Sequence, residues 1–248
     1  MTLTQLLTLT LPEIVITLAA LVLLGLDMLW HRNAARQRLL PWIAMAGVAL
    51  TLGATLTVWP LSGAQGIAIG APGSVGGFGG DQTPMLALDP LALFFKLFTV
   101  LVLALVGLAA NEYMQTRTPF RGEFYALMLL AGLAMMLAAA ATNLLMIYLA
   151  IEFVSITGYV LTGYLRDDAR STEGAVKYFI YGAVGSALML YGFSLLYGAT
   201  GSLDLAGIQA ALARNALGTG WLIYPSIIMV LAGLGFKIAL VPFHQWAP

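Results

Sequence analysis

Residues 144–198 read LLMIYLAIEFVSITGYVLTGYLRDDARSTEGAVKYFIYGAVGSALMLYGFSLLYG, two apolar runs on either side of a charged turn. An α-helix needs about 20 mainly apolar residues to cross the hydrocarbon core of a bilayer. The charges gather at 166–170, where the sequence is RDDAR, and the runs themselves carry few. The stretch therefore predicts two membrane-spanning helices, over 143–165 and 173–198, joined by the loop Arg166–Arg170.

The composition of the whole chain agrees with an integral membrane protein. Of its 248 residues, 60% are hydrophobic and 9% are charged, and the mean hydropathy is +0.92. A single water-facing globule cannot bury that much apolar surface, so lipid must form part of the solvent. The apolar runs predict an all-α, polytopic transmembrane helix bundle of about seven spans: 9–30, 39–60, 90–111, 121–141, 143–165, 173–198 and 221–246.

Local signals mark several helix ends. An Asp at a helix start accepts free backbone N–H groups and a Pro fits the first helical position, so Asp89-Pro90 predicts the start of the third span. Between the fourth and fifth spans only Thr142 and Asn143 are polar. A turn is the favoured interpretation there, and one long re-entrant segment is the alternative. The first span lacks the basic start of a signal peptide and contains Glu13, so it is interpreted as a mature helix.

The arginines predict an orientation. Loops one, three and five carry seven arginines, whereas the loops on the other side carry only Arg214. Because cytoplasmic loops are enriched in Lys and Arg, the N-terminus is expected outside the cytoplasm. The glycine-rich loop Gly63–Gly80 and the loop 199–220 are expected on that same outer side. The seven arginines are Arg32, Arg36, Arg38, Arg117, Arg121, Arg166 and Arg170.

Residues that the sequence lacks exclude several kinds of chemistry. Cysteine is absent, and the two histidines, His31 and His244, lie far apart, so neither Cys-held iron–sulfur clusters nor Cys/His zinc sites are expected on this chain. No GxxxxGK loop or strand-linked GxGxxG is present, which argues against nucleotide binding. The formal net charge is zero, so nucleic acid is not an expected partner. An ATP-driven pump is therefore not expected, and any energy that the protein uses must come from a gradient or from a partner protein.

Glu152 is a charge deep in an apolar span. It lies about ten residues, or about 15 Å, from the predicted start of its helix, near the bilayer midplane. A charge at that depth costs roughly 2.5–3.5 kcal/mol on insertion scales unless it faces protein or water. Burial favours the neutral carboxyl and a nearby ammonium favours the carboxylate, so a Glu beside a Lys can act as a proton switch. The alternative is a protonated Glu that only hydrogen-bonds a neighbouring helix.

Lys237 is a second charge at depth, about sixteen residues into the last span. Pro242 lacks an N–H group and its ring clashes with the carbonyl of residue 238, so the helix is predicted to kink or break one turn beyond the lysine. Broken helices in membranes line protein or water-filled cavities. Lys237, the break and His244 are therefore expected to cluster at a site of proton exchange. A lysine stem that snorkels toward one membrane face is the alternative.

The other ionisable residues have more ordinary interpretations. Lys177 lies four residues after Glu173, so a local surface pair is as well supported as a part in proton transfer. Lys96, seven residues into the third span, has no partner in its own sequence neighbourhood, and a snorkelling or packing role is favoured. Four acidic residues near span ends are assigned to the interface: Glu13, Asp27, Glu112 and Glu123. Recurring glycines at 158–163 and 182–185 are explained by close helix packing in lipid.

Two long runs carry a specific resemblance. They are AIEFVSITGYVLTGYLRDDARSTEGAVKYFIYGAVGSALMLYGFSLLYGATGS at 150–202 and GLGFKIALVPFHQWAP at 233–248. Together they resemble the N-type (subunit 2) antiporter-like membrane subunit of NADH:quinone oxidoreductase, respiratory complex I. The resemblance is strong over 121–248, while the first three spans agree only in pattern.

The resemblance implies roles for individual residues. Glu152 matches the family's fifth-helix glutamate, and Lys237 matches the lysine of the discontinuous seventh helix with which it pairs. Lys177, in AVKY, matches the sixth-helix lysine. By the same resemblance, residues 1–120 hold three N-terminal transmembrane helices, and 121–248 hold helices four to seven of a first, incomplete antiporter-like repeat. The end at Trp246–Pro248 is expected to be a truncation, and the family's eighth- and twelfth-helix lysines lie beyond it.

The implied function is that of a proton-translocating membrane subunit in a multi-subunit enzyme. Redox chemistry would take place in partner subunits, which would hold NADH, FMN, iron–sulfur clusters and quinone, with no cofactor on this chain. Quinone reduction would shift the Glu152–Lys237 interaction through a charge or conformational change passed along the membrane. The expected partners are other membrane subunits of complex I and the lipid of a bacterial plasma membrane. The alternatives are a subunit of a multi-subunit cation/proton antiporter and a membrane scaffold that conducts nothing.

Overall fold

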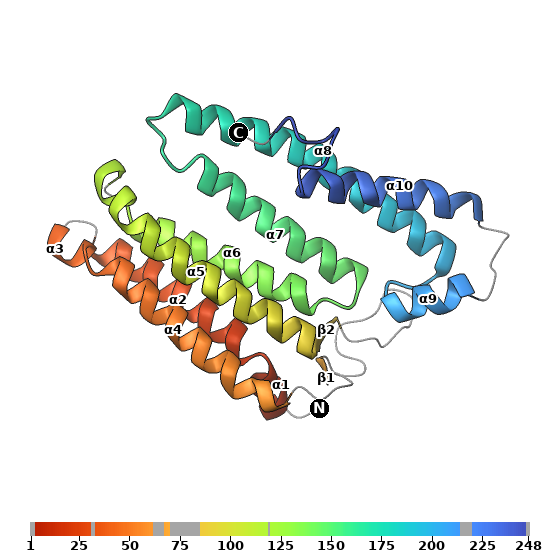
Figure 1. The fold of residues 1–248 in the computed structure, drawn as a ribbon, viewed down its shortest axis with the longest axis horizontal. Helices are drawn as coiled ribbons and strands as arrows, with labels where there is room; N and C mark the ends of the chain where they lie inside the picture. Colours follow the sequence, from red (N-terminus) through yellow and green to blue (C-terminus); the bar gives the residue numbers. More distant parts are fainter. Residues whose placement is uncertain are drawn as a thin grey trace.

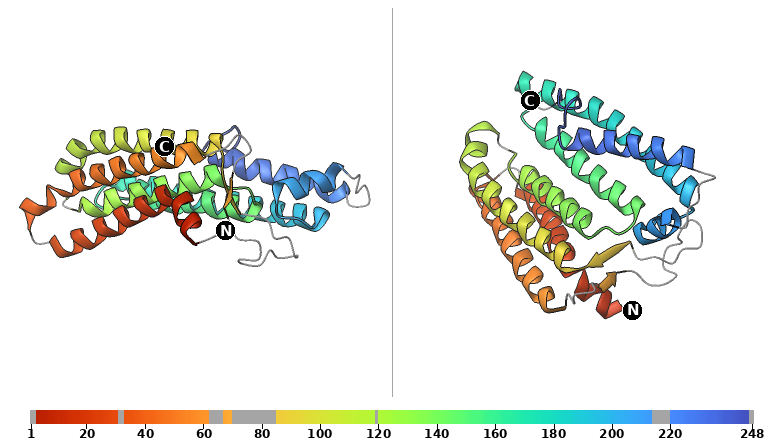
Figure 2. Two further views of the ribbon diagram at one scale, coloured as in Figure 1. Left: turned by 90° about the horizontal axis from the view of Figure 1, so that it is seen from below. Right: turned by 45° about the vertical axis from the view of Figure 1, so that its right-hand side comes forward.

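Long antiparallel α-helices make up most of the fold, as the computed structural model shows (Figure 1). The structure describes residues 3–30, 33–61, 67–69, 85–118, 120–213 and 220–246. Seen edge-on, the bundle is flattened (Figure 2). Its elements in chain order are α1 (Leu3–Leu9), α2 (Leu11–Trp30), α3 (Ala34–Gln37), α4 (Leu40–Val58), η1 (Trp59–Leu61), β1 (Ile67–Ile69), β2 (Leu86–Leu88), α5 (Pro90–Arg117), α6 (Gly122–Ala140), α7 (Leu144–Thr162), α8 (Ala169–Thr200), α9 (Leu205–Ala213) and α10 (Gly220–Lys237).

The predicted spans are present. Within the described residues, six helices are long and apolar enough to cross a membrane, namely α2, α4 with its flanking turns, α5, α6, α7 and α8, and α10 is a shorter apolar helix. Because α6 ends at Ala140 and α7 begins at Leu144, the region between them is a turn and not a re-entrant segment. The all-α transmembrane prediction is confirmed. Several expected features, Arg32, Arg214, most of Gly63–Gly80 and the last two residues, lie outside the described part of the chain.

The described arginines of the three predicted cytoplasmic loops lie together at one end of the helix bundle. We call it the arginine end, defined by Arg36, Arg117, Arg121 and Arg166, which follow or precede helices that all turn there. The orientation of this end relative to the membrane stays a prediction.

Capping side chains start the helices where the sequence indicated. Asp89 accepts a hydrogen bond from the Ala92 N–H at 2.6 Å and is followed by Pro90 at the first position of α5. Asn143 accepts from the Leu145 N–H at 2.8 Å at the start of α7, and Asp168 accepts from Arg170 at the start of α8. Each oxygen satisfies an N–H group that the helix itself leaves without a partner.

The main core joins the N-terminal helices to α6. Apolar side chains of α2, α4, α5 and α6 interdigitate, and the fully buried Tyr125 donates its hydroxyl hydrogen to the Gly107 carbonyl at 3.2 Å. Since α6 follows residue 121 yet packs against α2 and α5, the helices on the two sides of the predicted domain boundary share one core. The boundary itself stays a prediction. Members of the core include Ile16, Ala20, Leu23, Leu40, Ala44, Val48, Val100, Leu103, Leu129, Leu133 and Met136.

Helices α7, α8 and α10 form the other side of the bundle, with α10 lying along α8 (Figure 1). Glycines of α8 allow this close approach, as expected from the sequence. A Cβ atom at Gly185 would lie 3.0 Å from the Phe236 ring of α10, and one at Gly182 would lie 2.0 Å from the Tyr159 hydroxyl of α7. Small residues thus let large aromatic side chains lie directly against the α8 backbone.

Small elements that the sequence analysis did not predict lie at the end opposite the arginines. The short strands β1 and β2 pair antiparallel, with Ala68 opposite Ala87. Helix α9 occupies the predicted loop 199–220, and the Leu144 N–H at the start of α7 donates to the Leu203 carbonyl at 2.9 Å. These contacts join the loops that connect the long helices.

The last helix breaks, but earlier than predicted. Helix α10 ends at Lys237 itself, and residues 238–246 form turns instead of a further helical turn before Pro242. The Leu240 N–H donates to the Gly235 carbonyl at 2.8 Å and the Ala239 N–H donates to the Phe236 carbonyl at 3.1 Å. These two bonds and the left-handed Ala239, with φ of +52°, form a Schellman closure, which satisfies carbonyls at the helix end. The closure, and not the proline, sets the last helical residue.

Candidate functional site

Three helices bring Glu152 and Lys237 together. Glu152 lies in the middle of α7 and Lys237 is the last residue of α10, and α8 packs against both helices. The Lys237 Nζ lies 4.0 Å from Glu152 Oε2, and the two side chains are 13% and 24% exposed. The pairing expected from the sequence is therefore present, at the point where α10 breaks.

Two serines complete this site. Ser186 of α8 donates its hydroxyl hydrogen to Glu152 Oε2 at 2.5 Å, and it accepts a hydrogen bond from Lys237 Nζ at 3.3 Å. Ser155 of α7 also accepts from Lys237, and it donates to the Ile151 carbonyl at 2.7 Å. Both serines are buried. The lysine is thus held by two hydroxyls, and one of these also contacts the glutamate.

The sequence analysis missed both serines. Ser155 follows Glu152 by three residues, so a helix places the two on the same face. Ser186 lies in the glycine-containing segment that was assigned to helix packing alone. A search for polar residues within one turn of each buried charge finds Ser155, whereas nothing local in the sequence indicates that Ser186 contacts Glu152.

Lys177 and His244 lie outside this arrangement. Lys177 is 55% exposed and pairs with Glu173, 64% exposed, as the local alternative described. His244 is exposed in the turns after α10, and in the described part of the chain no polar contact joins it to Glu152 or Lys237. The expected clustering of His244 with Lys237 therefore stays a prediction, and none of the described contacts supports it.

Aromatic rings cover the site on the side of the helix break. The Tyr178 ring of α8 stacks on Trp246 with 4.4 Å between centroids and 11° between planes, and Trp246 also lies against Phe236 at 4.9 Å. The indole N–H of Trp246 donates to the Phe236 carbonyl at 3.0 Å, a group at the end of α10. This stack ties the segment after the break back onto α8.

A second buried ion pair lies among the N-terminal helices. Lys96 of α5 is fully buried and its Nζ lies 2.5 Å from Oε1 of Glu13 on α2, whose side chain is 10% exposed. The assignment of Glu13 to the interface is therefore wrong, and of the two roles favoured for Lys96 the structure excludes snorkelling but not packing. Helix α5 carries Lys96 inward between Leu93 and Val100, so its amine reaches a carboxylate distant in sequence and not the membrane surface.

Asp27 is also more buried than expected. It is 5% exposed and accepts a hydrogen bond from Gln37 Nε2 at 2.9 Å. A Cβ atom at Gly122 would lie 2.6 Å from Asp27 Oδ1, so the carboxylate sits directly against the first residue of α6. Negative charge is favourable beside the free N–H groups of a helix start. Asp27 thus stabilises the turn into α6.

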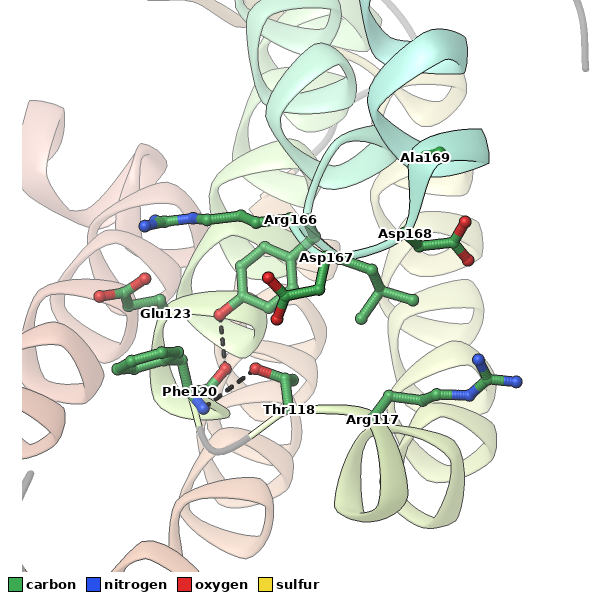
Figure 3. Close-up of a pocket in the computed structure, with 10 residues that line it drawn as sticks. Arg117, Thr118, Phe120, Glu123, Arg166, Asp167, Asp168 and Ala169 are labelled. Carbon is green, nitrogen blue, oxygen red and sulfur yellow. Dashed lines mark hydrogen bonds between the residues drawn. The ribbon is translucent and has the colours of Figure 1, made fainter.

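A polar cavity of about 600 Å³ opens at the arginine end, away from the buried pair. Figure 3 shows Arg166 and Glu123 extending to one side of it and Arg117 and Asp168 lying on the other, with Asp167 between the two sides. The Tyr164 hydroxyl donates to the Phe120 carbonyl at 2.5 Å and closes one wall. Burial raises the pKa of Tyr164, so its hydroxyl keeps its proton to a higher pH than that of an exposed tyrosine. The cavity holds charges of both signs.

The part of the chain that the structure describes contains no group of three or more His, Asp or Glu side chains close enough to hold a metal ion. The polar groups of the site are the carboxylate, the ammonium and two hydroxyls, all of which can donate or accept protons. The arrangement is suited to moving protons within a protein interior.

Comparisons with known proteins point to one family. A protein-family model described as "NADH:quinone oxidoreductase/Mrp antiporter, TM" matches residues 141–248, which include both members of the buried pair. NADH-quinone oxidoreductase subunit N from Anaeromyxobacter is 37% identical over 244 residues, covering 96% of this chain and 44% of the relative. The subunit N from Rhizorhabdus wittichii is 36% identical over 249 residues, covering 100% of this chain and 47% of the relative.

Solved structures of related complexes contain chains with the same fold. A chain of respiratory complex I from Thermus thermophilus superimposes with a TM-score of 0.70 at 30% identity, over 96% of this chain and 46% of that one. A chain of the Mrp complex from Dietzia shares the fold, with a TM-score of 0.69 at 21% identity, over 96% and 43%. This chain thus spans about half the length of the relatives it matches. By sequence and by fold, it belongs to the antiporter-like membrane subunits of the NADH:quinone oxidoreductase/Mrp antiporter family and is similar to their N-type members.

Proposed function

We propose that this chain translocates protons as part of an N-type membrane subunit, with Glu152 and Lys237 as the groups that exchange them. The observation that supports this most is the buried pair at the break of α10, joined by the hydroxyl of Ser186 and not by a tight ion pair. Ionisable groups inside membrane bundles mark ion or proton pathways. A purely structural pair would not require the helix to end at its lysine.

The energy of the pair suits a switch. At the observed 4.0 Å and an effective dielectric constant of about 20, unit charges attract by roughly 4 kcal/mol. Separating the two charges removes this attraction, and with it the interaction that favours the charged form of each group. A movement of a few ångströms at the end of α10 can therefore load or release a proton.

Lys177 and His244 are proposed as groups at the two approaches to the pair. Lys177 is exposed to solvent and lies nine residues before Ser186 on α8, which is about 13 Å along the helix. An exposed amine can exchange protons with water freely, so Lys177 is suited to the arginine end of the path. His244, on the exposed turns after α10, is proposed as the group beyond the break.

We place the redox chemistry in partner proteins. NADH, FMN, iron–sulfur clusters and quinone would be bound by other subunits of a complex I, and quinone reduction there would displace the end of α10. The proposed location is a bacterial plasma membrane, with the arginine end facing the cytoplasm and the N-terminus outside. The resemblance to subunit N relatives supports this assembly.

The test uses inverted membrane vesicles that carry the assembled complex. NADH-driven proton uptake is compared among the wild type, Glu152→Gln and Lys237→Met, at matched quinone reductase content. Glu112→Gln is the control, because Glu112 is an exposed carboxylate at the end of α5. Reduced uptake per NADH in the two site variants, with normal uptake in the control, is the expected result. Unchanged uptake in both site variants would overturn the proposal and favour the scaffold alternative.

The cation/proton antiporter alternative gives a different outcome in the same vesicles. An antiporter subunit needs no redox partner, so the chain would not co-purify with NADH-oxidising subunits, and an imposed sodium gradient would drive proton movement without NADH. Co-purification with quinone reductase activity is the expected result.

A further inference from the structure

The direct contact between Lys237 and Glu152 is too long for proton transfer. The separation of 4.0 Å between Nζ and Oε2 is too long for a hydrogen bond from nitrogen to oxygen, since a contact of even about 3.6 Å no longer counts as one. A proton passes efficiently only between groups within hydrogen-bond reach, directly or through one intervening group. Proton transfer from Lys237 to Glu152 therefore needs an intervening group that hydrogen-bonds to both.

Ser186 is in position to make that connection. Its hydroxyl donates to Glu152 Oε2 at 2.5 Å while its oxygen accepts from Lys237 Nζ at 3.3 Å. The residue is 4% exposed, on the α8 face that packs against α10. The donor, the hydroxyl and the acceptor form one continuous chain of hydrogen bonds with a defined direction.

Ser155 lies closer to the lysine than Ser186 does, but its own hydroxyl does not lead to a carboxylate. It accepts from Lys237, yet its own hydroxyl hydrogen goes to the Ile151 carbonyl at 2.7 Å. A backbone carbonyl is an acceptor that does not take up a proton at physiological pH, so this hydrogen bond does not lead to a group that can store the proton. The two serines therefore differ in role: Ser155 holds the ammonium in place, and Ser186 connects it to a carboxylate.

We propose that Ser186 is the proton relay between Lys237 and Glu152. In the transfer, an N–H bond of the Lys237 ammonium breaks and its proton bonds to Ser186 Oγ. The original Ser186 O–H bond breaks as its proton bonds to Glu152 Oε2. The products are a neutral lysine amine, an intact serine hydroxyl and a neutral carboxyl group, with no change in net charge and no electron transfer. The relay rests on the proposed function of the Glu152–Lys237 pair.

The test is a matched pair of substitutions, Ser186→Thr and Ser186→Val. The two new side chains are both β-branched and of similar shape, and only threonine keeps the hydroxyl. NADH-driven proton uptake is measured in vesicles with equal amounts of assembled complex. We expect the Val variant to take up protons at least about tenfold more slowly than the Thr variant, since a positioned proton-transfer group contributes a factor of about 10²–10⁴.

Three alanine variants complete the set: Ser186→Ala, Ser155→Ala and Ser194→Ala. Ser194 is an exposed serine two turns further along α8 and serves as the control for the substitution itself. Ser186→Ala is expected to lower the uptake rate more than Ser155→Ala, and Ser194→Ala is expected to match the wild type. Equal uptake by the Thr and Val variants, at any level, would overturn the relay.

Glu152→Gln is measured alongside these variants. If Glu152→Gln stops uptake while the Thr and Val variants pump equally, only the relay fails and the pair remains the proton site. If Glu152→Gln pumps normally, the proposed function fails, and the relay with it.

Discussion

Removing either partner of the Glu13–Lys96 pair should strongly destabilise the N-terminal helices. The pair lies between two apolar groups of residues, the main core and a cap cluster formed by Leu9, Val58, Leu88 and Leu93. On α5, Leu93 of the cap cluster and Val100 of the main core flank Lys96 by about one turn each. A charge left alone there has neither water nor a counterion.

The structure sets the magnitude. At 2.5 Å and an effective dielectric constant of about 20, the charges attract by roughly 6–7 kcal/mol, which offsets the cost of removing both from water. Breaking a buried pair by deleting one partner destabilises proteins by about 3–5 kcal/mol. In a chain of this size, about 2–4 °C of melting temperature corresponds to each kcal/mol, so a loss of roughly 6–20 °C is expected.

The two single variants should differ. Glu13→Leu leaves the ammonium of Lys96 fully buried, whereas Lys96→Met leaves a carboxylate whose side chain is 10% exposed. Glu13→Leu is therefore the more destabilising. The double variant replaces both charges with apolar groups, and it should recover most of the lost stability because no unpaired charge remains.

Thermal unfolding of the purified protein in detergent measures these effects in a double-mutant cycle. The exposed pair Glu173–Lys177 is the internal control, and Glu173→Gln with Lys177→Met should leave the melting temperature unchanged. The reasoning is refuted if Glu13→Leu melts within about 2 °C of the wild type, or if the double variant is less stable than both single variants.

Three further predictions concern other parts of the fold. Gly233→Val should separate α8 from α10 and lower the melting temperature, since a Cβ atom there would lie 2.7 Å from the Gly185 carbonyl, and Gly25→Ala, at a glycine with open space, is its control. Asp168→Ala removes the cap of α8 and should cost about 1 kcal/mol of unfolding free energy, while Asp168→Asn should restore most of it. The folded protein holds the pKa of Tyr164 above the ordinary value of 10.0, so the contribution of Tyr164 to stability is complete below about pH 10 and falls as the pH rises further. Unfolding free energies measured across this range should therefore fall less with rising pH in Tyr164→Phe than in the wild type.

The helices could be predicted from the sequence because lipid imposes a simple rule. Backbone groups in a bilayer must be satisfied within the helix, so each run of about 20 apolar residues becomes a span. Asp89 and Asn143 marked helix starts for a local reason, a side-chain oxygen close to free N–H groups. The strands and α9 lie in loops, where tertiary contacts rather than periodicity decide the structure.

The site was predictable only in its charged members. Glu152 and Lys237 stand out because a charge in an apolar run needs a reason, and the resemblance to a known family paired them. Ser186 does not stand out, since a serine among glycines on a membrane helix is equally typical of packing. Its contact with Glu152 depends on how α7 and α8 pack, which no local pattern contains.

Proximity in sequence also misled in two places. Lys96 and Glu13 are 83 positions apart, so neither had a visible partner, yet they form the most deeply buried ion pair among the described residues. His244 is seven positions from Lys237 and was expected to join it, but the left-handed Ala239 ends the helix between them, and the described hydrogen bonds of Lys237 go to Ser155 and Ser186. In both cases the path of the backbone decided the contact.

The most direct test of the central claim is whether Glu152 changes its protonation state during turnover. Infrared difference spectra of the assembled complex, recorded with and without NADH, report the C=O stretch of a protonated carboxyl group. We predict a carboxyl band in the wild type that is lost in Glu152→Gln and kept in Glu112→Gln. An identical spectrum in Glu152→Gln would contradict the account, because Glu152 would then keep one protonation state while the complex works.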